Sequence, residues 1–332
     1  YKPDQMGFYE ATVEVPKNMY LPPLPVVEKI GQSEKLIFPT GRFSGVWSTI
    51  ELEYARSLGV KIIETRRGCT FHNAGYIFRD FVNTLYDMRK EAQAKGDGVG
   101  STLTKLLMNS CYGRFGLNTD REQIVFDNWR DTSLKFHSEI EYVKEGRPVS
   151  TYLMTKDVVL EKTFTNVAIP AWVTSHARIH MHKIMWKAKS EIYYTDTDSI
   201  FTTKKMETGN ELGELKEEYR AKKAVFLLPK TYVVEGEDDF KKLAMKGFDK
   251  KKIGKFTYRD FYTALEGDLR NMQVVHDAKF AKFKTAAKKG NLTSMVGSQV
   301  KGIRSMYDKR VIIKTKDKWN TRPLHIKEGF AE

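Results

Sequence analysis

Two aspartates separated by one residue are the clearest candidates for chemistry in this sequence. Apolar residues that favour β-strands flank Asp196 and Asp198, which predicts a hairpin with both carboxylates at its turn. Clustered carboxylates bind hard divalent cations through oxygen, so the turn is a candidate metal site. A polar turn without a ligand is the alternative interpretation. A calcium-binding loop fits poorly, because Phe201 occupies the sixth position, where that loop requires glycine.

A second group of polar residues recurs at helical spacing upstream. Lys105, Asn109 and Tyr112 lie at positions i, i+4 and i+7, so they share one face of a predicted helix. A cation, an amide and an aromatic ring in this order could hold a triphosphate, a sugar and a base edge. The same residues could equally form a solvated helix face. We expect the other side of this helix to be covered by Leu103, Leu106, Leu107 and Cys111.

The pattern of apolar residues predicts the elements that position these side chains. We expect strands at residues 8–15, 60–64, 191–195, 199–203 and 231–235. We expect helices at residues 48–58, 77–95, 101–112, 170–187 and 210–222. Strands that are scattered along the chain, rather than alternating with helices, favour an α+β fold over a doubly wound sheet.

Two further regions have a composition of their own. Residues 118–165 are polar and strand-prone, which indicates an inserted β-rich module. Residues 276–289 are basic and are expected to be helical. This basic stretch is either a solvated helix or a surface that grips a nucleic-acid backbone.

Two other patterns suggest sites that we discount. Gly96, Gly98 and Gly100 follow a predicted helix rather than a strand, which favours a tight turn between helices over a dinucleotide-binding loop. His176, His180 and His182 are closely spaced but lack an intervening Glu and an obvious third zinc ligand. Arg178 lies between the first two histidines and would repel a cation.

Composition narrows the class of partner. The 332 residues include 56 Lys and Arg against 42 Asp and Glu, and the net charge of +14 points to a polyanion such as nucleic acid. No stretch approaches the roughly 18 consecutive apolar residues of a membrane helix, which excludes a protein that spans a membrane through helices. Two cysteines are too few for a disulfide scaffold, so a reducing compartment is the default.

Together the two polar segments resemble motifs of the family B DNA polymerases. Residues 105–113, Lys-x-x-x-Asn-Ser-x-Tyr-Gly, are similar to the fingers motif of that family. Residues 194–199, Tyr-x-Asp-Thr-Asp-Ser, are similar to its palm motif. The order of the two motifs and their separation also agree with the family.

Weaker matches indicate the protein-primed branch of that family. Lys230-Thr-Tyr232 is similar to a Lys-x-Tyr primer-strand motif, and residues 174–178 are similar to a Thr-x-x-Gly/Ala-Arg motif. The 118–165 module lies where this branch has its second terminal-protein-region insertion. The amino-acid sequence of residues 106–116 is close to that of polymerases of mitochondrial linear plasmids. The resemblance covers essentially the whole chain.

The resemblance implies a DNA-directed DNA polymerase that transfers nucleotides with two Mg²⁺ ions, for which Mn²⁺ can substitute. Asp198 would be the main metal ligand of this chain, and Asp196 would support metal binding or its geometry. Lys105 and Arg89 would bind the triphosphate, and Asn109 and Tyr112 would shape the nucleotide pocket. Lys230 and Tyr232 would hold the primer end. Thr174 and Arg178 would contact the DNA backbone.

The implied architecture is a right hand: a palm of antiparallel sheet with helices, fingers formed by a helical hairpin, and a small thumb. We expect a partial palm with a first terminal-protein-region-like insertion at 1–70, fingers at 71–117, the second insertion at 118–165, palm at 166–260 and thumb at 261–332. The implied partners are primer–template DNA, dNTPs and a terminal protein as primer, and no membrane. The implied location is the mitochondrion, in replication of a linear plasmid.

One motif of the family is missing from this sequence. The segment Asp-x-x-Ser-Leu-Tyr-Pro, which supplies the other palm carboxylate, does not occur, and it would fall before Tyr1 together with the exonuclease domain. We therefore expect a C-terminal fragment that is inactive alone. One alternative is a non-catalytic DNA-binding remnant of a decayed polymerase gene. Another is an RNA-templated polymerase, whose sites favour adjacent aspartates over Asp-Thr-Asp.

Overall fold

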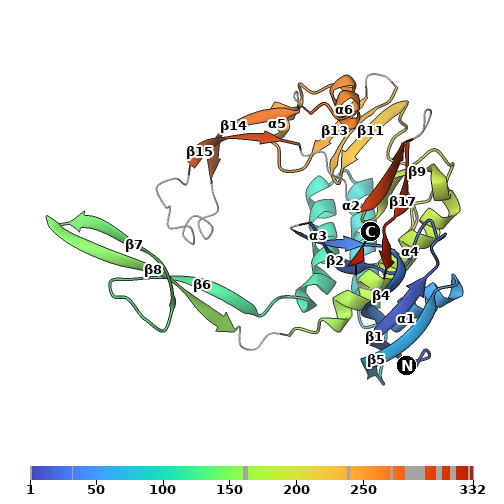
Figure 1. Cartoon of the computed structure of the whole chain (residues 1–332), viewed down its shortest axis with the longest axis horizontal. Coiled ribbons are helices and arrows are strands. Elements are labelled where there is room, and N and C mark those ends of the chain that lie inside the picture. Colours follow the sequence, from blue (N-terminus) through green and yellow to red (C-terminus); the bar gives the residue numbers. More distant parts are fainter. Residues whose placement is uncertain are drawn as a thin grey trace. The chain divides into compact units, whose positions relative to one another are not determined.

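The structure is a computed structural model of the chain (Figure 1). It describes residues 2–331, except residue 32 and residues 160–163, 238–239, 270–271, 281–295, 304–308, 315–318 and 328–329. The chain divides into two compact units. Unit 1 comprises residues 1–117, 165–218 and 306–332, and unit 2 comprises residues 118–164 and 219–305. The five domains expected from the sequence stay a prediction.

Unit 1 contains a five-stranded sheet in the order β19-β18-β4-β1-β5. The strands are β1 (Met6–Val15), β4 (Thr40–Ser48), β5 (Lys61–Phe71), β18 (His325–Lys327) and β19 (Phe330–Ala331). β1 pairs antiparallel with both β4 and β5, and its apolar residues line the core of the unit. The strand predicted at 8–15 is confirmed, and the one predicted at 60–64 is longer, because pairing with β1 extends to Phe71.

Four helices of unit 1 and its hairpin at residues 192–202 lie where the sequence pattern predicted them, and its two other hairpins were not predicted. Its helices are α1 (Thr49–Ser57), α2 (Arg79–Ala94), α3 (Gly98–Phe115), α4 (Ala168–Ala188) and the short 3-10 helix η1 (Lys189–Glu191). Its two-stranded hairpins are β2 (Val26–Ile30) with β3 (Ser33–Ile37), β9 (Ile192–Asp196) with β10 (Ser199–Thr202), and β16 (Arg310–Lys314) with β17 (Trp319–Pro323). α4 packs against α1, α3 and β4, so it joins the sheet to the helical hairpin.

Unit 2 contains the predicted β-rich insertion as a three-stranded sheet in the order β6-β8-β7. Its strands are β6 (Asp120–Asp127), β7 (Lys135–Lys144) and β8 (Arg147–Val159). The rest of the unit consists of β11 (Lys223–Leu228), β12 (Thr231–Glu235), β13 (Lys241–Met245), α5 (Lys250–Ile253), α6 (Tyr258–Leu265), β14 (Gln273–Phe280) and β15 (Val296–Gly302). Phe261, Met272 and Val233 lie at the centre of the core that α6 forms with β11 and β12.

The helix predicted at 210–222 is wrong, because the structure has a loop there. Gly213 adopts φ of 90°, which a right-handed helix does not allow. The loop closes on itself through a hydrogen bond from the backbone N–H of Gly209 to the carbonyl of Leu215. It is also held from outside, since His180 on α4 hydrogen-bonds to the carbonyl of Gly213 over 2.6 Å. These contacts satisfy backbone groups that a helix would have paired internally.

The helix predicted at 276–289 is also wrong where the structure describes it. Residues 276–280 belong to β14, because they pair antiparallel with β15, and residues 281–289 lie outside the described residues. Among the described helices, none has the length and apolar character needed to cross a membrane.

Candidate functional site

The two candidate metal-binding aspartates lie at the turn that joins β9 to β10, as predicted. Asp196 pairs with Ser199, which leaves Thr197 and Asp198 as a two-residue turn. Thr197 adopts φ of 58°, an uncommon conformation for a residue branched at Cβ. The backbone N–H of Asp198 donates to the carbonyl of Asp196 over 2.7 Å, and the Ser199 hydroxyl donates to the same carbonyl over 3.0 Å. The strained turn is therefore held by its own hydrogen bonds.

The chemistry of this turn fits a hard divalent cation in part. Asp198 is exposed and Asp196 is half-buried, and carboxylate oxygens are the ligands that Mg²⁺ takes from proteins. Within the part of the chain that the structure describes, no three His, Cys, Asp or Glu side chains gather into one metal-binding group. The turn thus offers two acidic side chains, and a complete site needs additional ligands.

The second candidate group lies on α3, as the spacing predicted. Lys105 and Asn109 are exposed and Tyr112 is half-buried, and all three lie on one face of the helix. α3 begins at a tight turn after α2, where the Asp97 carboxylate accepts a hydrogen bond from the backbone N–H of Gly100 over 2.9 Å. The turn between helices predicted from the glycines is confirmed. The leucines expected to cover the other side of the helix are exposed, at 54% for Leu103, 63% for Leu106 and 41% for Leu107.

Arg89 lies on α2, which packs against α3. Arg89 follows Leu85 by four residues and precedes Ala92 by three, and both of these residues are buried. Arg89 therefore lies on the buried face of the helix. Its Nε is buried and has no hydrogen-bond partner among the described residues. A buried N–H without a partner costs free energy.

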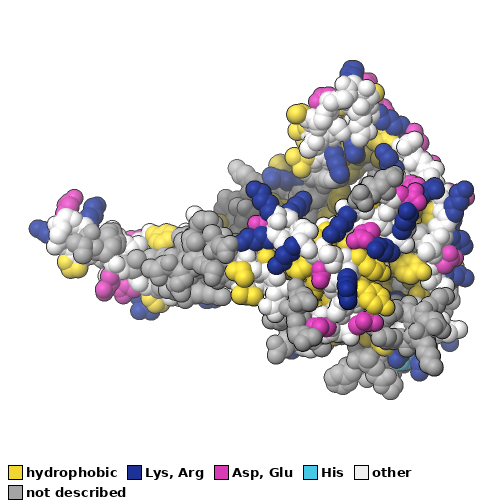
Figure 2. Space-filling model, turned by 90° about the horizontal axis from the view of Figure 1, so that it is seen from above, with side chains coloured by type: hydrophobic (Ala, Val, Ile, Leu, Met, Phe, Trp, Pro, Cys, Tyr) yellow, Lys and Arg dark blue, Asp and Glu magenta, His cyan; other side chains and the backbone are white. Residues whose placement is uncertain are grey.

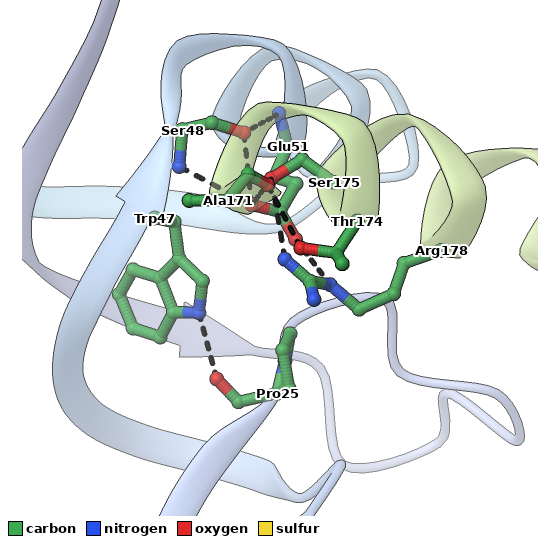
Figure 3. Close-up of polar contacts among 8 residues, drawn as sticks. All are labelled: Pro25, Trp47, Ser48, Glu51, Ala171, Thr174, Ser175 and Arg178. Atoms are coloured by element: carbon green, nitrogen blue, oxygen red, sulfur yellow. Dashed lines mark hydrogen bonds and ion pairs between the residues drawn. The ribbon is translucent and has the colours of Figure 1, made fainter. Parts of the chain in front are cut away.

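Arg178 and Thr174 lie one turn apart on α4, and Arg178 is held in a polar network (Figure 3). Nε of Arg178 donates to Oε1 of Glu51 on α1 over 2.7 Å, and Nη2 donates to Oγ of Ser175 over 3.2 Å. Oε2 of Glu51 accepts hydrogen bonds from Oγ of Ser175 over 2.7 Å and from Oγ of Ser48 over 2.8 Å. The Glu51 side chain is 3% exposed and that of Arg178 is 33% exposed.

Glu51 is a residue that the sequence reasoning missed. Burial alone would raise the pKa of its carboxyl, but hydrogen bonding and charge from Arg178, with hydrogen bonds from Ser175 and Ser48, hold the pKa below 4.5. The signal for its position was present, since Ser48-Thr-Ile-Glu51 matches a capping box and Glu51 fills that role in α1. Its burial against α4 had no local signal, because its partners lie more than 100 residues away.

Two of the histidines that we discounted as zinc ligands hold structural hydrogen bonds. His182 is buried, with Nδ1 2.8 Å from the hydroxyl of Tyr54 and Nε2 2.8 Å from the carbonyl of Leu21. His180 holds the loop that follows β10. The His176 ring packs edge-on against that of Trp172, with 5.7 Å between the ring centroids.

Lys230 and Tyr232, unlike the residues above, belong to unit 2. Lys230 lies in the two-residue turn between β11 and β12, where it adopts φ of 59°. Its carbonyl accepts a hydrogen bond from the backbone N–H of Lys246 over 2.9 Å. Tyr232 follows on β12, with its ring centroid 5.7 Å from that of Phe226. A lysine in the left-handed region is uncommon, and such conformations are enriched at functional sites.

Lys and Arg side chains are spread over much of the face shown in Figure 2, with fewer Asp and Glu side chains among them. This distribution agrees with the net charge of +14. A surface of this kind attracts polyanions over distances of about one Debye length, roughly 8 Å at physiological ionic strength.

Comparison with known protein families shows which family this chain belongs to. Residues 1–191 match the family described as DNA polymerase type B, organellar and viral. The chain belongs to this family. The match covers more than half of the chain and ends directly before β9, which begins at Ile192.

Several named relatives agree with membership of the type B polymerase family. A probable DNA polymerase of Neurospora intermedia is 29% identical over 234 residues, which cover 68% of this chain and 24% of that protein. A probable DNA polymerase of Podospora anserina is 29% identical over 268 residues, covering 70% of this chain and 22% of that protein. The DNA polymerase of Bacillus phage phi29 is 24% identical over 203 residues. The chain thus spans about a quarter of the length of the fungal relatives.

The fold is that of a type B polymerase. The crystal structure of phi29 DNA polymerase matches 92% of this chain with a TM-score of 0.60, at 17% sequence identity, and the match covers 52% of that protein. A complex of the same enzyme with primer–template DNA matches with a TM-score of 0.59. The α+β polymerase fold expected from the sequence is therefore confirmed.

Proposed function

We propose that this chain is the C-terminal part of an enzyme that synthesises DNA on a template by transferring nucleotides to a primer 3′-hydroxyl. The observation that supports this most is the Asp196–Asp198 turn, found in a chain of the type B polymerase family directly after α4 and η1. Membership of that family makes phosphoryl transfer the reaction for which the two carboxylates are most readily explained.

The residues on the α2–α3 hairpin are proposed to bind the incoming nucleotide. Lys105 would neutralise charge on the triphosphate, and Asn109 and Tyr112, one and two turns further along the same face, would contact the sugar and base. Arg89 would add a second cation through a guanidinium whose Nε has no partner in the described part of the chain. Holding the triphosphate by several groups fixes the α-phosphorus for in-line attack.

The remaining candidate residues are proposed to bind the primer–template. Lys230 and Tyr232 would hold the primer end, and Thr174 and Arg178 would contact the DNA backbone. Asp198 and Asp196 would hold Mg²⁺, or Mn²⁺ in its place, which supplies Lewis-acid stabilisation of the charge that develops on the phosphoryl oxygens. The other carboxylate of the site would come from the Asp-x-x-Ser-Leu-Tyr-Pro motif outside this chain.

We further propose protein-primed replication of a linear plasmid in the mitochondrion, with a terminal protein as the primer. This proposal is supported by the resemblance of residues 106–116 to polymerases of mitochondrial linear plasmids and by the fungal relatives. Two measurements would test it: detection of the gene product in purified mitochondria, and detection of a terminal protein covalently linked to the ends of the plasmid. Recovery only in the cytosol would contradict it.

Substitution of one turn carboxylate tests the proposed reaction. In the full-length enzyme, Asp198→Asn keeps the size of the side chain but removes its charge, so primer extension should fall by more than roughly 100-fold. DNA affinity should stay close to that of the unsubstituted enzyme, because the substitution removes no basic group. Extension of a labelled primer and equilibrium binding of the same DNA measure the two effects.

A matched control is available beside the turn. Glu207→Gln neutralises a carboxylate in the loop after β10 whose partner among the described residues is Lys187 at the surface, over 3.1 Å. It should leave primer extension unchanged. If Asp198→Asn extends the primer as well as this control does, the proposed catalytic role of Asp198 is wrong. If the unsubstituted full-length protein binds DNA tightly but extends no primer, a non-catalytic binding protein is favoured.

A further inference from the structure

The Arg178 side chain uses only part of its hydrogen-bonding capacity inside the protein. Nε and Nη2 face Glu51 and Ser175, whereas Nη1 makes no hydrogen bond within the described residues. The side chain is 33% exposed, while the carboxylate that holds it is 3% exposed. One edge of the planar guanidinium is therefore anchored, through Nε on α1 and through Nη2 on α4, and the remaining N–H groups stay available to a ligand.

We propose that Glu51 is a positioning residue for nucleic-acid binding, which holds the Arg178 guanidinium so that its Nη1 side binds a backbone phosphate. The inference rests on the proposed function, because it takes DNA as the ligand of this chain. It assigns to Glu51 a role that neither the motif match nor the position in a capping box implies.

The geometry favours positioning over a purely stabilising ion pair. Glu51 receives four hydrogen bonds from three residues on two helices and their flanks, and this number fixes both of its oxygens. A carboxylate that is fixed in this way transmits its orientation to the rigid fork of an arginine. Thr174 lies four residues before Arg178 on the same face of α4, and its hydroxyl donates to the carbonyl of Ala171 over 2.9 Å.

Removing the charge of Glu51 has two opposed effects on phosphate binding. The loss of a negative charge close to Arg178 strengthens long-range attraction for DNA. The loss of the anchor returns rotamer freedom to a long side chain, which weakens binding on the order of 10-fold. The salt dependence of binding separates the two effects, because a stronger long-range attraction does not lower the magnitude of the salt slope, whereas the loss of a phosphate contact does.

The test compares Glu51→Gln with the unsubstituted 332-residue chain in equilibrium binding of primer–template DNA over a series of salt concentrations. We expect Glu51→Gln to bind on the order of 10-fold more weakly at low salt, with the difference in affinity narrowing as salt rises. The slope of log affinity against log salt should fall in magnitude by about 0.9, as for the loss of one phosphate contact. A purely structural role would lower thermal stability and leave this slope unchanged.

The matched control is Asp260→Asn on α6. Asp260 occupies the same third helical position in a capping box with Thr257, so the substitution removes the same charge from the same helix position without an arginine partner. It should leave the salt slope unchanged. Arg178→Lys gives a second measurement: if Glu51 acts through the guanidinium fork, adding Glu51→Gln to Arg178→Lys should weaken binding little further.

Each outcome decides between the two proposals. A chain that fails to bind primer–template DNA contradicts the proposed function itself. A chain that binds, with Glu51→Gln equal to or tighter than the original at every salt concentration, overturns only the positioning role. If Glu51→Gln unfolds, Glu51→Asp keeps the charge but shortens the anchor by one methylene group, and unchanged affinity and slope in that variant contradict the proposal equally.

Discussion

His182 shows how a single buried side chain holds the helices around the candidate site. Because a carbonyl only accepts hydrogen bonds, Nε2 must donate to Leu21, and Nδ1 therefore accepts from the hydroxyl of Tyr54. The ring also stacks on Trp186, with 5.6 Å between the centroids. Burial lowers the pKa of His182 below 6.5, against an opposing effect of the bond to Leu21, so the fold favours the neutral ring.

This lowered pKa predicts how stability depends on pH. Below about pH 6.5 the unfolded chain takes up a proton on His182 that the folded chain resists, so the free energy of unfolding should fall as pH falls from 7 to 5. The contribution of Glu51 is lost mainly below this window, because its pKa is about 4.5 in the unfolded chain and lower in the fold. Urea unfolding at a series of pH values measures the effect.

The control for this prediction is the neighbouring His180, which is exposed. The variant His182→Gln should lose less stability than the original chain over this pH range, whereas His180→Gln should keep the original dependence. Identical pH profiles for the original chain and His182→Gln would contradict the prediction.

At the scale of elements, the close approach of β18 to β4 depends on a glycine. Gly41 adopts φ of 101°, and a Cβ at this position would overlap the backbone carbonyl of Ile326. Gly41→Ala should therefore reduce the free energy of unfolding by at least about 2 kcal/mol, from backbone strain and overlap together. Circular dichroism during urea unfolding measures the change.

Gly31 provides a matched comparison for Gly41. It also adopts a positive φ, of 63°, but a Cβ there meets open space in the described part of the chain. Gly31→Ala should cost only the backbone strain, about 1 kcal/mol. Equal losses in the two variants would show that the approach of β18 does not require the glycine.

Elements with local signals were predictable from the sequence, and elements fixed by distant contacts were not. The hairpin at Asp196 and Asp198 and the turn before α3 depend on residues within a few positions of one another. The loop over 210–222 was predicted as a helix, because its contact with His180 lies outside the local pattern. The pair of Glu51 with Arg178 spans 127 positions, so helix periodicity alone could not reveal it.

At the scale of the whole molecule, the chain belongs to the type B polymerase family. It carries the Asp-Thr-Asp turn and a helical hairpin with the candidate nucleotide-binding residues in unit 1, and Lys230 and Tyr232 in unit 2. It spans about a quarter of the length of its fungal relatives, and it lacks the Asp-x-x-Ser-Leu-Tyr-Pro motif. Complete activity is therefore a property to measure on the full-length gene product.

The most direct test of the central claim is template dependence of synthesis by that full-length product. A primer annealed to a DNA template should be extended with dNTPs and Mg²⁺, and the sequence of the product should be complementary to the template. An RNA template of the same sequence should support much less extension. Binding of the primer–template without extension under any metal, or preference for the RNA template, would contradict the account.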